Sequence, residues 1–454
     1  MTKLHLKAEE IHIPARGGVM LDRQMPMGKP WPVKYPVMLN AQFILARQGQ
    51  RWTQVGTRYL PLHFIQLTIE RVNDGFDISW DSYPWSGYKD KEPPQPSLTE
   101  FGSMAEAVED YREWMAATHS LREKTKNPEL PDWVQNVRLF LIVDMWGSDD
   151  VILADYDDVI HLIDDLDRIP APRDTVLYLP GWSNRWDAGY PEYNPAERLG
   201  GPVKFRQMVN RARASSYRIM PSTNVLGCAY DIPDFERFKP YQITDRAGRK
   251  CGWGERGQPC VTTPFAYMRP CAKPWRVHLL DKLEHLVKTY DLEALYLDQT
   301  LLIIDDPQCN MEEGLNTLIA EAKARFPGVL IAGEGCHERI IRSVSFCQIH
   351  GAPWTMGVGS LSYEKDSLIF QELFGDYAYF CGHISIPTAF VGGRQVGIIQ
   401  DLMREYWEEF WMRDDGFEKV RKYHDFRGVI RTLRINYKDH GLDPTTRTLI
   451  AELA

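Results

Sequence analysis

Two acidic residues stand directly after apolar runs that are typical of neighbouring strands. Asp298 ends the run LEALYLD and Glu334 ends GVLIAGE, with one helical stretch between them. Adjacent strands lie about 4.8 Å apart. Carboxyl groups that leave two such strands toward one pocket can come within about 5–5.5 Å, the separation found in retaining glycosidases. The pair therefore predicts double displacement at a glycosidic bond, with Asp298 as the nucleophile and Glu334 as the acid/base.

Each of these two residues also has a structural interpretation. An Asp or Glu just after a strand can cap the next helix or pair with an Arg, and for a single residue this role is the more common one. Two such residues on consecutive strands, at an edge rich in Trp, Asn and His, favour the catalytic interpretation.

The ends of the other predicted strands carry residues that suit a carbohydrate. Sugar rings stack on indoles, and their hydroxyl groups need many hydrogen-bond donors and acceptors. The candidate substrate-binding residues are Asp144, Trp146, Trp182, Asn184, Asn224, Tyr267, Arg269, Gln299, His337, His350 and His383. Alternatives stay open for some of them. Asp144 could instead hold an Arg such as Arg185, the two Trp could be core residues at the rim, and His350 and His383 could be structural.

Eight short apolar runs supply the strands that position these residues. They span 138–144, 175–181, 216–223, 292–298, 328–334, 345–351, 376–384 and 429–435, and helical patterns fall between the early ones. This alternation predicts an α/β fold, a (β/α)8 TIM-type barrel, whose active site lies at the carboxyl ends of the strands. A doubly wound open sheet is the less favoured alternative, because the chain has no GxGxxG after its first strand and no GxxxxGK[ST] motif.

The chain before the barrel has a different pattern. Residues 1–95 contain short runs with partial period-2 alternation, which predict a β-sandwich-like domain. Residues 96–136 are expected to be a linker and an entry helix, and 137–454 the barrel. A long insertion at about 225–275 should build part of the pocket, because an ordinary connection between a strand and a helix is much shorter.

Composition excludes several classes of partner. The net charge of −9 is spread along the 454 residues, without the basic stripe that nucleic-acid binding requires. No apolar run reaches the roughly 18 residues of a membrane span, and the start of the chain lacks a secretory signal. A cytoplasmic chain, or a trimmed one, is expected, and a homo-oligomer is compatible with the sequence. The eight scattered cysteines favour free buried thiols over disulfides, and no HExxH or CxxC spacing indicates a metal or other cofactor.

Several motifs resemble those of a known group. The helix EAVEDYREWM, the strand ends VDMWG and PGW, and the segments YMRPC, LYLDQ and IAGEG are similar to an uncharacterised bacterial family, a domain of unknown function among the glycoside hydrolase barrels. The order of Asp298 and Glu334 also resembles the endo-α-N-acetylgalactosaminidase family and, more remotely, the α-amylase superfamily, where the nucleophile Asp follows strand 4 and the acid/base Glu follows strand 5. This resemblance implies a retaining α-glycosidase.

The chain also departs from the α-amylase pattern. Tyr296 stands where that superfamily has an Arg two residues before the nucleophile, and no HD pair can be placed after strand 7. The third acidic residue of that superfamily is therefore not carried over. Two other hypotheses stay open at this stage, a carbohydrate-binding barrel without catalysis and a metal-dependent barrel hydrolase that uses Asp, His and Glu at strand ends.

Overall fold

The computed structural model describes most of the chain. The described residues are 1–88, 90–147, 151–184, 189–253, 265–349, 363–382, 428–435, 437 and 441–454. The chain divides into two compact units. The N-terminal unit comprises Met1–Asn127, Leu301–Asn316 and Gly335–His383, and the second unit comprises Pro128–Thr300, Thr317–Glu334 and Ile384–Ala454.

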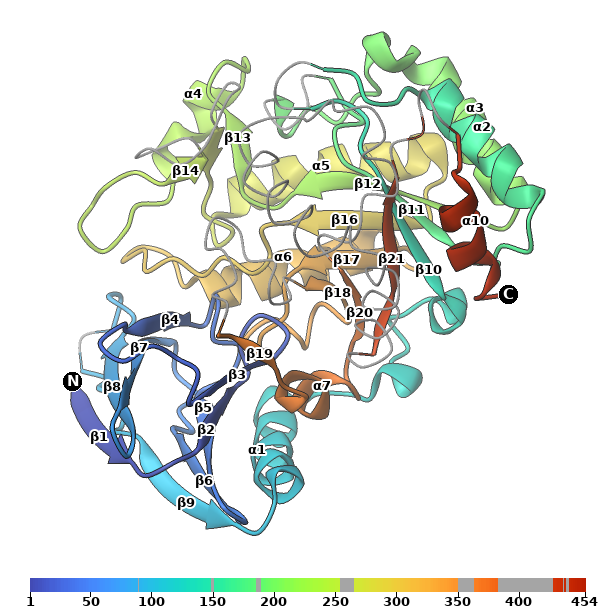
Figure 1. The fold of residues 1–454 in the computed structure, drawn as a ribbon. Coiled ribbons are helices and arrows are strands. Elements are labelled where there is room, and N and C mark those ends of the chain that lie inside the picture. The colour runs from blue at the N-terminus through green and yellow to red at the C-terminus, as the bar shows by residue number, and fades with distance from the viewer. Residues whose placement is uncertain are drawn as a thin grey trace. The chain divides into compact units, whose positions relative to one another are not determined.

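The N-terminal strands form two antiparallel sheets (Figure 1). One sheet has the order β1 (Thr2–Leu6), β8 (Gly75–Pro84), β7 (His63–Val72) and β4 (Trp31–Tyr35). The other has the order β19 (Lys365–Asp366), β3 (Val19–Asp22), β2 (Glu10–Ile13), β5 (Phe43–Gln48), β6 (Arg51–Gly56) and β9 (Ser97–Phe101). The expected sandwich-like character is confirmed, and β9 extends the sheets beyond residue 95.

Alternation along the strands creates the core of this unit. In β4 the side chains of Trp31, Val33 and Tyr35 are buried while those between them are exposed. Successive strand residues point to opposite faces, so one apolar face of each sheet can be buried. Trp31 and Trp80 are the largest side chains of the apolar cluster that results.

Eight strands form a closed barrel, which confirms the predicted fold class. Their order is β10 (Leu139–Val143), β11 (Val176–Leu179), β12 (Arg218–Asn224), β16 (Ala294–Asp298), β17 (Leu330–Glu334), β18 (Phe346–Ile349), β20 (Tyr379–Gly382) and β21 (Val429–Ile435). Each lies within one of the eight predicted runs or extends one residue beyond it. Their residues are nearly all buried, as expected for parallel strands covered on both faces.

Helices follow the early barrel strands and precede the barrel, as the helical patterns predict, and further helices lie elsewhere in the described residues. They are α1 (Met104–His119), α2 (Tyr156–Asp167), α3 (Gly201–Ala214), α4 (Phe235–Phe238), α5 (Lys273–Tyr290), α6 (Met311–Arg325), α7 (Ile369–Phe374) and α10 (Pro444–Ala451). Short 3-10 helices span Lys124–Lys126, Asp132–Asn136, Glu197–Leu199 and Lys239–Tyr241. Side chains satisfy the first backbone N–H groups of several helices, since Ser103 caps α1 and Asp155 forms a capping box with Asp158 at α2. None of the described helices has the length and apolarity needed to cross a membrane.

The long segment between β12 and α5 folds into a small sheet of its own. Its strands, in the order β13 (Gly227–Ala229), β15 (Phe265–Tyr267) and β14 (Gly252–Trp253), are antiparallel. The sheet belongs to the same unit as most of the barrel. The described residues of the predicted insertion thus form a sheet of their own, with Tyr267 on its middle strand.

Two cysteines differ from the prediction of free thiols. Cys271 and Cys309 are disulfide-bonded, so the prediction is wrong for them. It is confirmed for Cys228, Cys251, Cys336, Cys347 and Cys381, of which all but Cys251 are buried. Cys260 lies outside the described residues.

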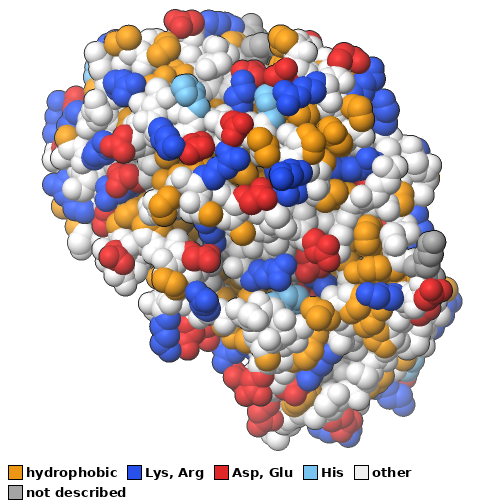
Figure 2. Space-filling view, turned by 180° about the vertical axis from the view of Figure 1, so that it is seen from behind, with side chains coloured by type: hydrophobic (Ala, Val, Ile, Leu, Met, Phe, Trp, Pro, Cys, Tyr) orange, Lys and Arg blue, Asp and Glu red, His pale blue; other side chains and the backbone are white. Residues whose placement is uncertain are grey.

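Charged side chains of both signs are mixed on the surface. On the face in Figure 2, acidic and basic groups alternate over short distances. Interleaved charges largely cancel at long range, so the described part of this face presents no extended field of one sign.

A buried polar network holds the segment that follows β17 within the N-terminal unit. The Arg339 side chain is fully buried and donates to Glu312 Oε2 at 3.2 Å and to the carbonyl oxygen of Tyr59 at 2.9 Å. Glu338 accepts from Tyr111 Oη at 2.7 Å and from Gln42 Nε2 at 2.7 Å. Buried charges are tolerated when they are paired and hydrogen-bonded, so this network fixes the chain just after Glu334.

Three buried histidines predict acid sensitivity of the N-terminal unit. Burial, followed for His63 and His119 by the positive charge of Arg339, lowers the pKa of His63, His119 and His337 to about 3. The unfolded chain binds these protons below its ordinary histidine pKa of about 6.5, whereas the folded chain does not. Stability should therefore fall as the pH drops from about 6.5 toward 3, by about 1.4 kcal/mol per pH unit for each histidine.

Urea denaturation at pH 7.5 and at pH 5.5 checks this expectation. His119→Phe should make the acid-induced loss smaller, because one of the buried histidines that titrate on unfolding is gone. His285→Asn, at an exposed position on α5, is the matched control and should leave the loss unchanged. Equal pH dependence in the parent and His119→Phe would contradict the assignment.

Candidate active site

Asp298 and Glu334 are the last residues of neighbouring barrel strands. In the parallel pairing of β16 with β17, Leu297 is the partner of Gly333, so the next pair along is Asp298 and Glu334. Alternate residues of a strand share a face. Both carboxylates therefore leave the same face of the sheet, at the carboxyl ends of their strands.

That face is the inside of the barrel. Tyr296, two residues before Asp298, contacts Tyr178 of β11 with ring centroids 4.5 Å apart. Because β12 lies between β11 and β16, side chains from these two strands meet across the concave interior. Asp298 and Glu334 accordingly stand at the inner mouth of the barrel, where TIM-barrel enzymes place their chemistry.

Asn224 supplies a fixed donor to Asp298. It ends β12, is fully buried, and donates from Nδ2 to Asp298 Oδ2 at 3.1 Å. Its Oδ1 accepts from the backbone N–H groups of Leu226 at 2.8 Å and Gly227 at 2.7 Å. These two bonds decide which end of the amide is oxygen, so the N–H must face the carboxylate. The donor that an ionised Asp298 requires is therefore in place.

Gln299 connects the two carboxylates through the backbone. Its φ of 65° lies in the left-handed region, which is uncommon for a residue other than Gly. In this conformation its backbone N–H donates to Glu334 Oε2 at 2.9 Å. Thr300 Oγ1 donates to the carbonyl oxygen of Glu334 at 2.8 Å. Glu334 is 5% exposed and is thus held on both its side chain and its backbone.

Tyr267 reaches the same place from the inserted sheet. Gln299 Nε2 donates to Tyr267 Oη at 3.1 Å. Burial, and after it the negative charges of Asp298 and Glu334, raise the pKa of the Tyr267 phenol. The phenol therefore stays protonated at neutral pH. Its hydroxyl is bonded to the side chain of Gln299, whose backbone N–H binds Glu334.

Asp144 pairs with an arginine other than Arg185. Arg434 of β21 donates to both Asp144 oxygens, at 2.6 Å from Nε and 3.0 Å from Nη2. Asp144 therefore forms an ion pair with Arg434, and its contact with substrate stays a prediction. Arg185, the partner considered from the sequence, lies outside the described residues. A charged residue within the apolar run VIRTLRI was the available signal for Arg434.

Trp182 and Asn184, two of the candidate substrate-binding residues, make contacts that hold the loop after β11 in place. Trp182 is 1% exposed, donates from Nε1 to the Ser222 carbonyl oxygen at 2.8 Å, and packs on Phe205 of α3 with ring centroids 4.9 Å apart. These contacts favour the alternative that Trp182 is a core residue at the rim, and stacking on a sugar stays a prediction. Asn184 Oδ1 accepts from the backbone N–H of Glu197 at 3.3 Å.

Trp146 keeps part of its surface exposed, but a cation covers its ring. It is half-buried, and the guanidinium carbon of Arg198 lies 4.5 Å from the ring centroid. A sugar would share the indole with this cation–π contact or use its other face.

Arg269 and His337 contact other parts of the protein. Arg269 donates to the Pro240 carbonyl oxygen at 3.4 Å and to Thr244 Oγ1 at 3.3 Å, within the inserted segment. His337 is fully buried in the N-terminal unit, with Nε2 at 3.2 Å from the Leu301 carbonyl oxygen. Burial of the whole ring favours a structural role for His337, and its binding of substrate stays a prediction. His350 and His383 lie outside the described residues.

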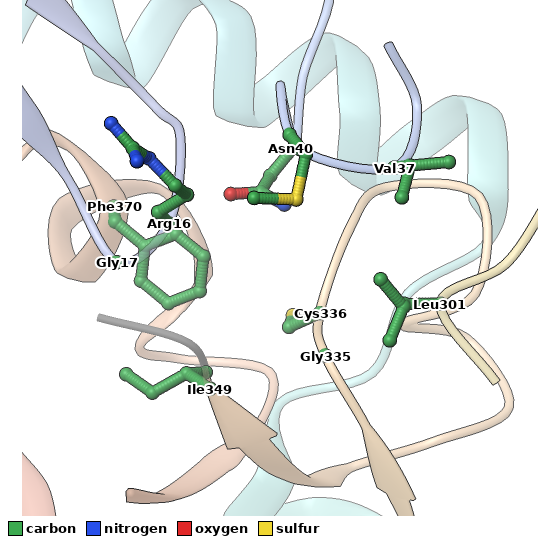
Figure 3. Close-up of a pocket in the computed structure, with 10 residues that line it drawn as sticks. Arg16, Gly17, Val37, Asn40, Leu301, Gly335, Cys336, Ile349 and Phe370 are labelled. Atoms are coloured by element: carbon green, nitrogen blue, oxygen red, sulfur yellow. The ribbon is translucent and has the colours of Figure 1, made fainter. Parts of the chain in front are cut away.

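A small cavity lies within the N-terminal unit (Figure 3). It is lined by Arg16, Gly17, Val37, Met38, Asn40, Leu301, Gly335, Cys336, Ile349 and Phe370. The Arg16 guanidinium turns away from the cavity and binds Glu364 at 2.5 Å. Asn40 and Cys336 are the polar side chains left at a mainly apolar wall, which is a poor setting for hydrolysis.

One group of described side chains is compact enough to share a metal ion. It consists of Glu192, Asp234 and His278. None of the three directly follows a barrel strand, and Glu192 binds Lys282 Nζ at 2.7 Å. A bound cation would compete with that lysine for Glu192. Because none of the three residues follows a barrel strand, this group is not the strand-end metal site considered from the sequence.

An Asn224→Ala variant tests the donor to Asp298. It should lower kcat and also destabilise the fold by about 1–3 kcal/mol, because two buried N–H groups lose their acceptor. Asn224→Asp separates the two effects. It keeps the acceptor for the backbone but places a second carboxylate beside Asp298, so the acid limb of the kcat/KM profile should move to higher pH. An unchanged acid limb together with unchanged kcat would contradict the role of Asn224.

One family model matches part of the chain. Residues 100–314 match the family described as Domain of unknown function (DUF6259). The expected resemblance to a domain of unknown function among glycoside-hydrolase-like barrels is confirmed. Asp298 lies within the DUF6259 region, whereas Glu334 follows it. No curated protein matches the chain in sequence.

Solved structures share the fold at low sequence identity. The ligand-free α-N-acetylgalactosaminidase NagBb from Bifidobacterium bifidum has a TM-score of 0.72 at 12% identity, over 99% of this chain and 74% of that one. Its Gal-NHAc-DNJ complex has a TM-score of 0.67 at 13% identity, over 83% of this chain and 64% of that one. The chain thus spans 64% of the length of that relative.

A second enzyme also has this fold. TtGalA, an α-galactosidase from Thermus thermophilus in complex with stachyose, has a TM-score of 0.61 at 11% identity, over 99% of this chain and 92% of that one. At such identities the likeness establishes the fold, and the chemistry has to come from the side chains at the barrel mouth.

Proposed function

We propose that the chain is a glycoside hydrolase that cleaves an α-glycosidic bond with retention of configuration. Asp298 is the nucleophile and Glu334 the acid/base. The observation that carries the proposal is the lateral pairing of these two residues at the inner mouth of the barrel, at the ends of β16 and β17. This is the arrangement that double displacement needs, with two carboxylates close enough to flank one anomeric carbon.

The first step forms a covalent intermediate. A carboxylate oxygen of Asp298 attacks the anomeric carbon, the bond from that carbon to the leaving oxygen breaks, and Glu334 gives its proton to the leaving oxygen. Asn224 orients the nucleophile through Oδ2. Because the Gln299 N–H faces Glu334 Oε2, Oε1 is the favoured carrier of the proton.

The second step releases the sugar. Glu334, now ionised, takes a proton from water while the water oxygen attacks the anomeric carbon, and the bond to Asp298 breaks. The residues then return to their starting protonation states. Two inversions at one carbon give net retention.

The names of the fold neighbours support a choice of sugar. Two of them are an α-N-acetylgalactosaminidase and an α-galactosidase. We therefore place α-galactosides and α-N-acetylgalactosaminides first among the substrates to be examined.

A panel of aryl α- and β-glycosides tests this function. Turnover is expected with at least one α-glycoside, and NMR should show the α-anomer of the free sugar as the first product. Turnover of β-glycosides alone would contradict the proposal. Sugar binding without turnover would favour a binding barrel, and loss of activity with a chelator would favour the metal-dependent hydrolase.

A further inference from the structure

Tyr267 and Gln299 form a polar pair beside the two carboxylates. Tyr267 is 4% exposed and Gln299 is 6% exposed. The Gln299 side chain donates to Tyr267 Oη, while its backbone N–H donates to Glu334. The pair is therefore bonded to Glu334, the acid/base, and one of its members, Gln299, directly follows the nucleophile Asp298.

Both members keep hydrogen-bonding capacity that the described residues do not use. Gln299 Oε1 is buried and accepts from no group in the described part of the chain. Tyr267 Oη accepts from Gln299, and its own proton has no acceptor among the described side chains. A buried polar group without a partner costs about 1–3 kcal/mol, so such a pair is costly unless a ligand completes it.

The position of the pair limits which part of a sugar it can meet. The Tyr267 hydroxyl is bonded to Gln299, which directly follows Asp298 and donates its N–H to Glu334, so the hydroxyl lies close to the anomeric carbon. The atoms next to that carbon are the ring oxygen and C2. The ring oxygen only accepts hydrogen bonds. A substituent on C2 that both donates and accepts, such as a hydroxyl or an acetamido group, matches the phenol proton and the amide oxygen together.

We propose that Tyr267 and Gln299 together recognise the substituent on C2 of the sugar bound at the barrel mouth. Tyr267 donates its hydroxyl proton to that substituent, and Gln299 Oε1 accepts from it. This inference rests on the proposed function. Hydrogen bonds at C2 strengthen in the transition state of glycoside hydrolysis, so the pair acts on kcat as well as on binding.

A comparison of substrates tests the proposal. The kcat/KM of the parent and of Tyr267→Phe is measured on the best aryl α-glycoside of the panel and on its 2-deoxy analogue. The substitution should cost about 10–100-fold on the first substrate and less than about 3-fold on the second, because the lost bond is absent there already. An equal cost on both substrates would overturn the proposal and assign Tyr267 to the ring oxygen or to Asp298.

A second tyrosine of the inserted segment is the matched control. Tyr230 Oη accepts from Gln242 Nε2 at 2.9 Å, as Tyr267 does from Gln299. Tyr230→Phe should change both substrates by the same small factor. A preference for the 2-deoxy substrate in Tyr230→Phe would mean that loss of any such pair disturbs the site.

Binding separates this inference from the proposed function. If no glycoside is cleaved, the proposed function fails. The inference is then judged by calorimetry with D-galactose and 2-deoxy-D-galactose. It predicts tighter binding of galactose to the parent and no difference in Tyr267→Phe, whereas equal affinities for the parent, or no binding, would overturn it.

Discussion

Replacing Asp298 with Asn is expected to lower kcat by a factor on the order of 10³ or more and to leave sugar binding intact. A neutral amide has the size of the carboxylate but cannot attack the anomeric carbon. The hydrogen bond from Asn224 ends on Asp298 Oδ2, which the variant can present as its amide oxygen. Steady-state kinetics on the best aryl glycoside, with calorimetry of the free sugar, measures both parts of the expectation.

The opposite end of the same strand offers a control. Asp291 ends α5 in the left-handed conformation, is exposed, and lies three residues before β16. Asp291→Asn should keep the parental kcat. An Asp298→Asn variant with half the parental kcat would assign the nucleophile to another residue, and Asp144 would be examined first.

Replacing Glu334 with Ala is expected to affect substrates according to their leaving groups. An activated aryl group departs with little help from an acid, so the loss should be far smaller for it than for an alkyl or sugar aglycone. The covalent intermediate should then accumulate, because no base activates water. External azide should restore the second step and give a sugar azide with the configuration of the substrate.

The outcome with azide decides the role of Glu334. If azide neither accelerates turnover nor yields a sugar azide on any aryl glycoside that the parent cleaves, Glu334 is a binding or structural carboxylate. Glu334→Gln complements the test, because it keeps an acceptor for the Gln299 N–H but has no proton to give at neutral pH. On substrates with a sugar aglycone, Glu334→Gln should lose as much activity as Glu334→Ala.

The barrel could be predicted because its strands carry their own signal. Parallel strands are covered on both faces, so they are continuous apolar runs, and the first charged residue after each run marks its carboxyl end. The runs ending at Asp298 and Glu334 follow this rule, and the register of their strands places the two residues side by side. At these positions the local sequence pattern and the pairing of the strands in the fold indicate the same arrangement.

Other features depend on contacts between distant parts of the chain. A Trp after a strand can face a ligand or the helical layer, and only the packing of Trp182 on Phe205 shows that it faces the layer. Likewise, Arg434 joins Asp144 only after the last barrel strand pairs with the first. The strand Lys365–Asp366 pairs with β3 near the start of the chain, which no local pattern indicates.

The central claim is that a carboxylate oxygen of Asp298 becomes covalently bound to the sugar. The most direct test is peptide mass mapping of the Glu334→Ala variant after incubation with the best activated aryl glycoside and rapid acid quenching. The account predicts one added glycosyl residue, confined to the peptide that contains Asp298 and located on that side chain by fragmentation. A glycosyl group on another carboxylate, or turnover of the aryl glycoside with no covalent adduct at any time after mixing, would contradict it.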